Sequence, residues 1–599
     1  MNTTQLENCI AHYQAGIPGL ADVARQLQSA PDPVPLYEQC YPLLERAMWS
    51  GEVDFHPLLA CYQSLFHEQE ALIQQRGKDE RHHFIIAIPI ADRPPHLRAC
   101  LESIHQLCET FGYGGKKNGV WEKIQVVVAE DSRFEANLRR DRELVEEYRQ
   151  KGLQVHHFGL DEQYELLHAL PPHIHEKLGH LLTTQPRDAF YLKGQAANRN
   201  LSYLKFLRLT QGKDRTLYYL VDSDQHFCVN RQTPDGEETV VALNYFHFID
   251  KIFRSTDTLM LTGKMVGDPP VSPSVMAANF LDDVSAFFTR LASLGEAQPC
   301  RFHGEQQKPG DAAYHDLAGL FGFEHKQATF DYPCRLEGSH DHGACLADFA
   351  ARLNAFFFGE HLTRKTWFDY KNDFTQLSPA RTVYPGNYIV NYAGLKYIIP
   401  FGHLRLRMSG PTAGRLIAAE IGPRFASFNM PNLHRRTTEA GLSDDFRPGV
   451  EVGEQSIDLS NEFERQFFGD LMLFATEELV KRVDVNQPFA KEVVEAVIAQ
   501  KEAELLALYQ LKHDAIVARN RQLNELVFNA AHWWQSVPDL VGALQQVRAF
   551  IDNIDRNFGE HALAWRQIQS EEHRARRKRQ IIEAMLEYRA ERNAWDSLF

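Results

Sequence analysis

Four short apolar runs, each followed by polar residues, alternate with segments of helical periodicity between residues 84 and 224. The runs read FIIAIPI (84–90), IQVVVAED (124–131), LQVHHFGL (153–160) and TLYYLVDSD (216–224), and most are rich in the β-branched or aromatic residues that favour strands. The segments between them place apolar residues three to four positions apart, as in LRACLESIHQLCETF. Alternating buried strands and helices indicate βαβ units. We therefore predict an α/β, Rossmann-like fold with a mainly parallel sheet, open at the carboxyl ends of its strands.

The pattern changes on either side of this region. Residues 1–80 and 456–599 have helical periodicity throughout and predict helical regions at both ends of the chain. Between them, residues 239–265 are expected to continue the sheet region, whereas the span of about 280–380 has little clear period and indicates an insertion. The predicted division is an N-terminal helical region, an α/β domain over 81–455 and a C-terminal helical domain.

Composition narrows the class of protein. The 599 residues include 64 basic and 79 acidic side chains, a net charge of −15, which argues against a general nucleic-acid binder. The hydrophobic fraction of 44% and charged fraction of 24% are those of a globular protein. No stretch reaches the roughly 18–20 apolar residues that span a bilayer, and the N-terminus lacks the pattern of a secretory signal. Nine cysteines without a C-x-x-C pair indicate reduced thiols, so we expect a soluble cytoplasmic protein.

The strongest candidate for chemistry follows the fourth apolar run. Asp222, Ser223 and Asp224 place two carboxylates two residues apart at the end of a buried strand. Hard oxygen ligands at the rim where open sheets bind their ligands suit Mg²⁺ or Mn²⁺ carrying phosphates. The same spacing is also common in turns and helix caps.

The elements around this motif resemble those of GT-A nucleotide-sugar glycosyltransferases, especially the family-2-like group. The first strand ends in a Pro-x-x-[Asn/Asp]-Arg turn, the second in acidic residues and Ser, and a helix with Gly-x-x-x-x-Arg-Asn precedes the D-x-D strand. The second strand departs from that pattern, with Ala-Glu-Asp-Ser in place of Asp-Asp-Gly-Ser. The residues that the resemblance places on the nucleotide sugar are Pro89, Ala91, Arg93, Glu130, Asp131, Gly194, Arg199, Asn200, Asp222, Ser223 and Asp224.

The resemblance continues beyond the predicted insertion. A Gly-rich segment at 407–415 leads to Glu420, which falls on the acidic position of the family although Ile421 replaces the usual second acid. His434 falls on the histidine that joins the D-x-D motif in binding the metal or diphosphate. The resemblance thus implies Glu420 as the catalytic carboxylate and Asp222, Asp224 and His434 as metal ligands. The ordinary alternatives are a helix-capping or paired glutamate and a surface histidine.

The function that the resemblance implies is a glycosyltransferase of the hexosyltransferase type, dependent on Mn²⁺ or Mg²⁺. It would move a sugar from a nucleotide-sugar donor to an unidentified acceptor, with retention or inversion left open. One alternative is a sugar nucleotidyltransferase, although AIPIADRPPH lacks the Gly-rich basic signature of that class after the first strand. The other is a non-catalytic scaffold with a vestigial core, whose helical arms bind partners. Separately, the C-terminal helices could form a homo-oligomer.

Two further features have competing interpretations. Cys334, His340, His342 and Cys345 lie within CRLEGSHDHGAC and could bind zinc, but their spacing matches no common zinc finger, and a Gly-rich loop is the favoured interpretation. The basic run at 573–579 could contact an anionic membrane surface peripherally, and a solvated helix face offset by neighbouring glutamates is favoured.

The aromatic residues Trp533 and Trp534 of the C-terminal helices indicate domain packing or an oligomer contact.

Overall fold

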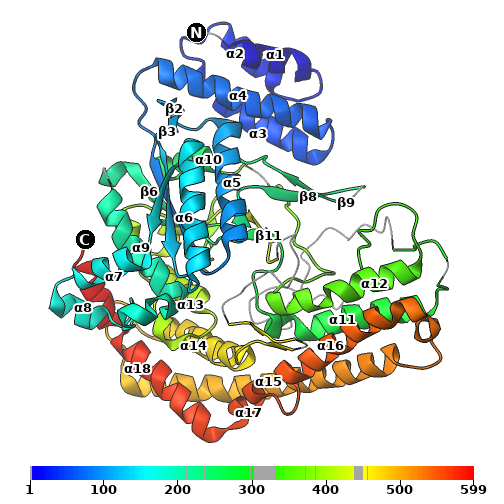
Figure 1. The fold of residues 1–599 in the computed structure, drawn as a ribbon. Helices are drawn as coiled ribbons and strands as arrows, with labels where there is room; N and C mark the ends of the chain where they lie inside the picture. Colours follow the sequence, from blue (N-terminus) through cyan, green and yellow to red (C-terminus); the bar gives the residue numbers. More distant parts are fainter. Residues whose placement is uncertain are drawn as a thin grey trace.

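An eight-stranded, mainly parallel sheet lies at the centre of the computed structural model, with helices on both of its faces (Figure 1). The structure describes residues 3–599 apart from 211, 235, 297, 303–328, 330, 372, 385, 438–448 and 455. The strand order is β12-β14-β10-β13-β6-β1-β4-β5. The four apolar runs become neighbouring parallel strands, and their bounds are β1 (His83–Ile90), β4 (Ile124–Glu130), β5 (Gln154–Phe158) and β6 (Thr216–Val221).

Helices connect the predicted parallel strands and bury both faces of the sheet. Every residue of β4 and β6 is buried, which is why these strands read as continuous apolar runs. The remaining half of the sheet contains two reversed strands: β13, which is antiparallel to both β6 and β10, and the edge strand β12, which is antiparallel to β14. The bounds of this half are β10 (Met260–Thr262), β12 (Ser378–Pro379), β13 (Asn387–Val390) and β14 (Phe425–Ser427).

A second, three-stranded sheet has the order β11-β15-β7 and lies beyond the carboxyl end of β6. Its strands are β7 (Gln225–His226), β11 (Met265–Gly267) and β15 (Asn432–His434). Three two-stranded ribbons complete the strands: β2 (Lys116–Lys117) with β3 (Val120–Trp121), β8 (Val229–Thr233) with β9 (Gly236–Val240), and β16 (Glu451–Val452) with β17 (Ile457–Asp458).

Helices cover the two faces of the large sheet in separate cores. One core contains α5 (Pro94–Phe111), α6 (Glu135–Gln150) and α10 (Tyr245–Ser255). The other contains α7 (Leu160–His168), α8 (Pro172–Leu178), α9 (Gln195–Leu209) and α13 (Ser409–Ile421). The predicted α/β, Rossmann-like fold class, with a mainly parallel sheet and helical regions at both ends, is confirmed. The expectation for 239–265 holds only in part, because β10 joins the sheet whereas residues 245–255 form α10.

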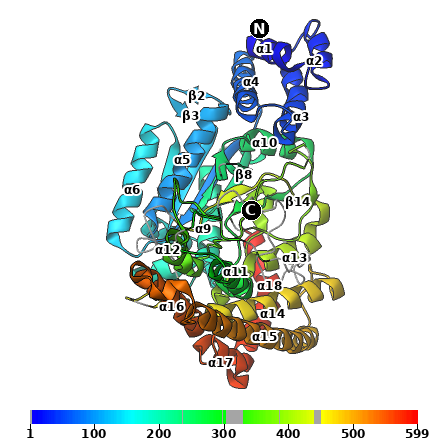
Figure 2. The same cartoon turned by 90° about the vertical axis from the view of Figure 1, so that its right-hand side faces the viewer.

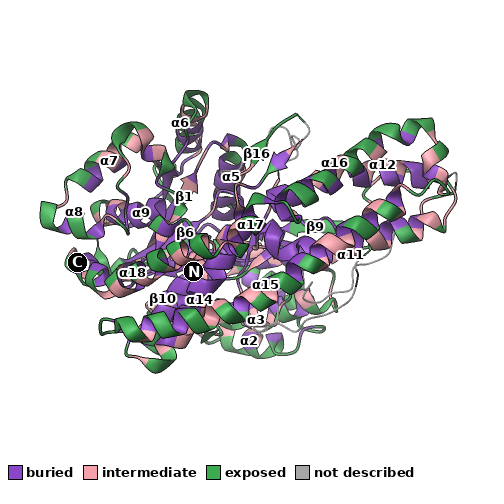
Figure 3. Cartoon of the chain, turned by 90° about the horizontal axis from the view of Figure 1, so that it is seen from below, coloured by how far each residue is buried: buried purple, intermediate pink, exposed green. Residues whose placement is uncertain are grey.

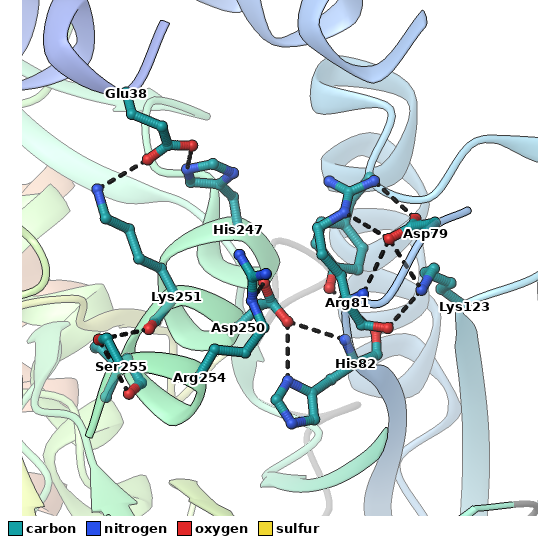
Figure 4. A network of polar contacts seen from close by, with 12 residues as sticks. Glu38, Asp79, Arg81, His82, Lys123, His247, Asp250, Lys251, Arg254 and Ser255 are labelled. Carbon is teal, nitrogen blue, oxygen red and sulfur yellow. Dashed lines mark hydrogen bonds and ion pairs between the residues drawn. The ribbon is translucent and has the colours of Figure 1, made fainter. Parts of the chain in front are cut away.

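The N-terminal helices pack on the first of these cores. They are α1 (Thr4–Tyr13), α2 (Leu20–Leu27), α3 (Val34–Ser50) and α4 (Phe55–Gln75), at the top of Figure 1. Polar contacts fasten them to the sheet domain (Figure 4). The carboxylate of Glu38 of α3 lies 3.1 Å from His247 Nε2 and accepts a hydrogen bond from Lys251 of α10 at 2.8 Å, and Asp250 of α10 lies 2.8 Å from the ring of His82, directly before β1.

We expect the contact between α3 and α10 to weaken in acid. Burial, the largest influence, raises the pKa of Glu38, but His247 and Lys251 outweigh it and hold that pKa well below its ordinary value of 4.5. The carboxylate therefore stabilises the fold fully above about pH 4.5, and this contribution disappears as the pH falls towards the folded-state pKa. Glu38→Gln should lower the free energy of unfolding by about 1–3 kcal/mol at pH 7, measured by urea denaturation, and by less at pH 4.

The matched control is Glu52→Gln, an exposed glutamate of the same helical region. It should change the free energy of unfolding by less than about 0.5 kcal/mol at either pH. A loss in Glu38→Gln that is equal at pH 4 and pH 7 would show that the ion pairs do not stabilise this contact.

The C-terminal helices form a separate layer below the sheet domain (Figure 2). They are α14 (Glu462–Arg482), α15 (Lys491–Val527), α16 (Val541–Phe558), α17 (Leu563–Gln569) and α18 (Glu571–Asp596). Two helices of the predicted insertion, α11 (Pro273–Ala292) and α12 (His342–Arg352), share one apolar core with them. Viewed from below, α15 and α16 bury one side and expose the other (Figure 3), whereas α11 is buried along most of its length. The domain boundaries given by the sequence remain a prediction.

Side chains of this layer explain two of the sequence features. Trp534 is fully buried and donates to the carbonyl of Val527 at 2.9 Å, and Trp533 donates to that of Leu291 at 3.2 Å, so both serve packing within the chain. The basic run on α18 pairs with carboxylates of other helices. His573 and Arg577 bind Glu464 of α14, and Arg574 and Lys578 bind Glu502 of α15. The basic run is therefore neutralised in part by carboxylates of α14 and α15, besides the glutamates next to it in the sequence.

The far end of α18 returns to the large sheet. Trp595 is fully buried in the core that α9 and α13 share with the sheet, and its indole N–H donates to the carbonyl of Leu395 at 3.0 Å. Among the residues that the structure describes, no helix combines the length and apolarity needed to cross a bilayer.

Candidate functional site

The polar residues that follow the central strands lie at one edge of the sheet. Because β1, β4 and β6 are parallel neighbours, Arg93, Asp131 and Asp224 all follow carboxyl strand ends. Open α/β sheets bind their ligands at this edge. The structure thus gathers the three strand-end motifs, and the ion pair of Arg199 with Asp222 adds the helix motif to them.

The three-stranded sheet brings His434 to Asp224. β7 directly follows Asp224 and pairs with β15, where His434 is opposite Gln225. The backbone N–H of Arg435 donates to the carbonyl of Asp224 at 2.9 Å, which closes this pairing. As a result, His434 Nε2 lies 3.6 Å from Asp224 Oδ1, and both side chains are buried.

The orientation of the His434 ring shows what this pair can bind. Nδ1 lies 3.0 Å from the carbonyl of Asp268, which can only accept, so Nδ1 carries a proton and Nε2 faces the carboxylate. Asp224 Oδ1 is buried and, among the described residues, has no hydrogen-bond partner. A carboxylate oxygen and an imidazole nitrogen at this distance are favourable together only with positive charge between them, either a proton on Nε2 or a metal ion. A divalent cation with oxygen and imidazole ligands fits this donor set.

Arginines surround the same carboxylate. Arg93 and Arg436 approach Asp224 Oδ2 at 3.4 and 3.9 Å. Burial, the largest influence, raises the pKa of Asp224, but His434, Arg93 and Arg436 together hold it well below its usual value. The Nε atoms of these arginines are buried and find no hydrogen-bond partner in the described part of the chain. Two buried guanidinium groups around one carboxylate carry more positive than negative charge, and a phosphorylated ligand would balance the excess.

Asp222 has a different environment from Asp224. Its side chain is partly exposed and its Oδ1 forms an ion pair with Arg199 of α9. Asp222, Asp224 and His434 do not form one of the described His, Cys, Asp and Glu groups whose donor atoms all lie within 4.8 Å of one another. The geometry therefore fits a metal best at Asp224 and His434, with Arg199 holding Asp222 beside them.

The acidic end of β4 forms a neighbouring polar cluster. Asp131 pairs with the buried Lys193, and burial raises the pKa of Asp131 to about 6 despite this partner. Glu130 is fully buried, accepts the N–H of Ser132 at 2.8 Å and lies 3.3 Å from His157 Nε2. These contacts give Glu130 a role inside the fold, whereas Asp131 and Lys193 lie next to the sheet edge.

The other predicted nucleotide-sugar contacts divide between the edge and the interior. Gly194 directly precedes α9 and has a φ of 87°, and a Cβ added there would meet no atom within 4 Å. The side chain of Asn200 instead binds three backbone groups, of Leu181 and Ile399, and so is used by the fold. The remaining predicted contacts lie at the carboxyl ends of their strands: Pro89, Ala91 and Ser223.

Glu420 lies at the opposite edge of the sheet. It is in the last turn of α13, which leads into the amino end of β14, and β14 runs in the same direction as β6. Its carboxylate is 3.6 Å from Arg592 of α18. This position does not support the expected role of Glu420 as the catalytic base. The structure favours the ordinary alternative, a paired glutamate on a helix.

Residues that the sequence analysis did not select complete the site. Asp92 has a left-handed φ of 54°, and its carboxylate accepts the N–H groups of Arg133 and Phe134 at 2.9 and 3.0 Å, which ties the loop after β1 to the start of α6. Asp268 accepts the N–H of Arg436 at 2.7 Å besides orienting His434. Only their positions in the sequence could have indicated these two residues: Asp92 is inside the Pro-x-x-Asp-Arg turn, and Asp268 directly follows the short strand β11.

Comparisons with known proteins complete this description. No protein-family model and no curated protein sequence matches the chain. Among solved structures, the mannosyltransferase PcManGT from Pyrobaculum calidifontis, in complex with GDP-Man and Mn²⁺, is similar at 8% identity over 89% of this chain and 98% of that one, with a TM-score of 0.29. TarS of S. aureus is similar at 14% identity over 85% of this chain and 91% of that one, with a TM-score of 0.23. At such scores these similarities carry no argument about function.

Proposed function

We propose that the protein is a glycosyltransferase that uses a nucleotide-sugar donor and a divalent cation, Mn²⁺ or Mg²⁺. One observation carries the proposal: the buried Oδ1 of Asp224 faces Nε2 of His434, with Arg93 and Arg436 on the other oxygen of the same carboxylate. This arrangement offers a cation site and a positively charged wall at the edge where open α/β sheets bind ligands.

Each residue has a separate task in this proposal. Asp224 and His434 would hold the cation, which would supply positive charge to balance the diphosphate of the leaving group. Asp268 fixes the tautomer of His434, so that Nε2 is directed at the ligand side. Arg93 and Arg436 stabilise negative charge that develops on the leaving group, and burial makes their charge more effective than it would be in water.

The nucleoside part of the donor is expected at the neighbouring strand ends. Asp131 and Lys193 lie at the carboxyl end of β4, directly beside β1 and the Arg93 turn. An acid and a lysine in partly dehydrated surroundings discriminate well between hydrogen-bonding groups of a base or ribose. Two further carboxylates lie close to each other on the His434 side of the site: Asp268, which binds His434 and Arg436, and Glu360, which accepts a hydrogen bond from Thr437 at 2.6 Å. Burial, and then the nearby charge of Asp268, raise the pKa of Glu360.

A panel of nucleotide sugars tests the proposal. Thermal unfolding is measured with each nucleotide sugar, in the presence of Mn²⁺ or of EDTA. A ligand that binds only the folded protein stabilises it by about 2.7 kcal/mol at a hundredfold excess over Kd, so one donor should raise Tm with Mn²⁺ and have little effect with EDTA. Release of the nucleoside diphosphate from that donor is then followed over time.

The outcomes separate the alternatives. Release of a nucleoside diphosphate supports the transferase. Consumption of a nucleoside triphosphate with a sugar phosphate, and formation of pyrophosphate, would identify a nucleotidyltransferase instead. Absence of both binding and turnover across the panel would contradict the proposal and favour a scaffold.

A further inference from the structure

A second group of metal-ligating side chains lies far from Asp224, at the junction of α11 and α12. Its members are Cys300, Cys334, His340 and Cys345, and one donor atom from each lies within 4.8 Å of all the others. The sulfur atoms of Cys345 and Cys300 are 3.4 Å apart, those of Cys334 and Cys345 are 3.9 Å apart, and Cys334 Sγ is 3.2 Å from His340 Nε2.

These distances are those of ligands around one small ion. Zinc–sulfur bonds of about 2.3 Å and zinc–nitrogen bonds of about 2.0–2.1 Å at tetrahedral angles place two sulfurs about 3.8 Å apart and a sulfur and a nitrogen about 3.5 Å apart. A disulfide would require about 2.05 Å between sulfurs. Three thiolates and one imidazole form a closed set of four ligands, which is the set found in structural zinc sites.

The ligands are held in place by hydrogen bonds of the surrounding backbone. His340 Nδ1 donates to the carbonyl of Gly338 at 2.9 Å, which leaves Nε2 to face the sulfurs. The N–H of Phe302 donates to the Cys300 sulfur at 3.3 Å, and the N–H of Leu336 donates to that of Cys334. Such outer contacts orient metal ligands and balance the charge of thiolates.

The backbone also aligns the two segments that supply the ligands. The N–H of Cys300 donates to the carbonyl of His340 at 3.1 Å, and Pro299 forms a bridge with Asp341. Cys345 lies in the first turn of α12, where the helix dipole favours a thiolate, and Asp341 caps that helix through the N–H of Ala344 at 2.9 Å.

We propose that Cys300, Cys334, His340 and Cys345 bind one zinc ion that fastens the end of the α11 segment to the start of α12. The site holds no position for a substrate, so its task is structural. The four ligands would join the segment around Cys300 to the segment from Cys334 to Cys345, beside the apolar core that α11 and α12 share with the C-terminal helices. His342, although it belongs to the same sequence cluster, has Nδ1 at 2.7 Å from the carbonyl of Gly295 and is not a ligand.

Metal analysis of the whole protein tests the site. Protein produced with zinc in the medium and isolated without chelators is expected to contain about one zinc per chain. After removal of the zinc, Co²⁺ should give the thiolate-to-metal charge-transfer bands and intense visible bands of a tetrahedral site. Cys334→Ser and His340→Gln should each weaken zinc binding by at least about tenfold, since even outer partners of ligands change affinity by about 10–100-fold.

Matched controls and a measurement on the unaltered protein complete the test. His342→Gln and Cys61→Ser should retain the zinc. In the unaltered protein, alkylation followed by mass spectrometry should find Cys300, Cys334 and Cys345 protected until a chelator is added, and Cys61 equally reactive before and after. Failure of the reduced protein to take up zinc or cobalt would overturn the proposal. So would a disulfide among the three cysteines, or loss of zinc from His342→Gln with retention in His340→Gln.

Discussion

Asp224→Asn is expected to reduce sugar transfer by about a thousandfold, equivalent to about 4 kcal/mol of transition-state stabilisation. The substitution keeps the size of the side chain but removes the charge that His434, Arg93 and Arg436 surround. It would leave these buried cations without their shared counter-charge and remove an oxygen ligand of the proposed metal ion. The rate of nucleoside diphosphate release, with the best donor of the panel and saturating Mn²⁺, measures the effect.

Two variants show whether the loss is specific. Asp222→Asn should lose less activity than Asp224→Asn, because Asp222 is partly exposed and held by Arg199. Asp214→Asn, at the opposite edge of the sheet before β6, should retain the activity of the unaltered protein. If Asp224→Asn were as active as Asp214→Asn, the proposed cation site would be wrong. A folded Asp224→Asn protein, with an unchanged circular dichroism spectrum, is required for this comparison.

Asp283→Asn is expected to produce the largest loss of stability, about 3–5 kcal/mol in the free energy of unfolding. Asp283 of α11 is fully buried and binds Arg364 through two hydrogen bonds of 2.7 and 2.8 Å, with Thr363 donating to it at 2.6 Å. Removing the carboxylate charge takes from the buried guanidinium of Arg364 the anion that binds it through two hydrogen bonds. Urea denaturation followed by circular dichroism measures the change.

The adjacent residue supplies the control for this prediction. Asp282 forms an ion pair with Arg519 of α15 at 2.6 Å, but the two side chains are 40% and 33% exposed. Solvent screening makes such a pair worth at most about 1 kcal/mol, so Asp282→Asn should have a small effect. Equal losses in the two variants would show that burial does not set the strength of these ion pairs.

The part of the site that follows the central strands could be predicted from the sequence, for a physical reason. Strands buried on both faces have a strong apolar pattern, and in a parallel sheet the residues after them share one edge. This reasoning placed Asp224 and Arg93 correctly at the same edge. The order of motifs also led to His434, although the pairing of β7 with β15 that brings it to Asp224 leaves little trace in such short strands.

Glu420 shows where motif order fails. The Gly-rich segment and α13 follow one another as expected, but the edge at which a helix ends depends on the direction of the next strand. Since β14 is parallel to β6, the end of α13 lies at the amino edge, away from Asp224. Nothing in the residues around Glu420 distinguishes an ion pair with α18 from a catalytic role.

The cysteine cluster shows a different limit. Cys334, His340 and Cys345 are close in the sequence, yet with His342 they match no common spacing. The fourth ligand, Cys300, comes from a distant segment that only the backbone bridge at Pro299 and Asp341 brings alongside. A set of ligands from separate segments can be recognised only in the tertiary structure. The same is true here of the choice between His340 and His342 as the histidine ligand.

The burial of Trp595 has a consequence for how the chain acquires its structure during synthesis. Its indole fills the core under the sheet and binds the backbone at Leu395, 200 residues earlier in the chain. Domains generally fold as units while the ribosome works from the N-terminus. The core that α9 and α13 share with the sheet is complete only after α18 has been synthesised. Until then the nascent sheet domain exposes the apolar surface that Trp595 covers, and such surface is a binding site for chaperones.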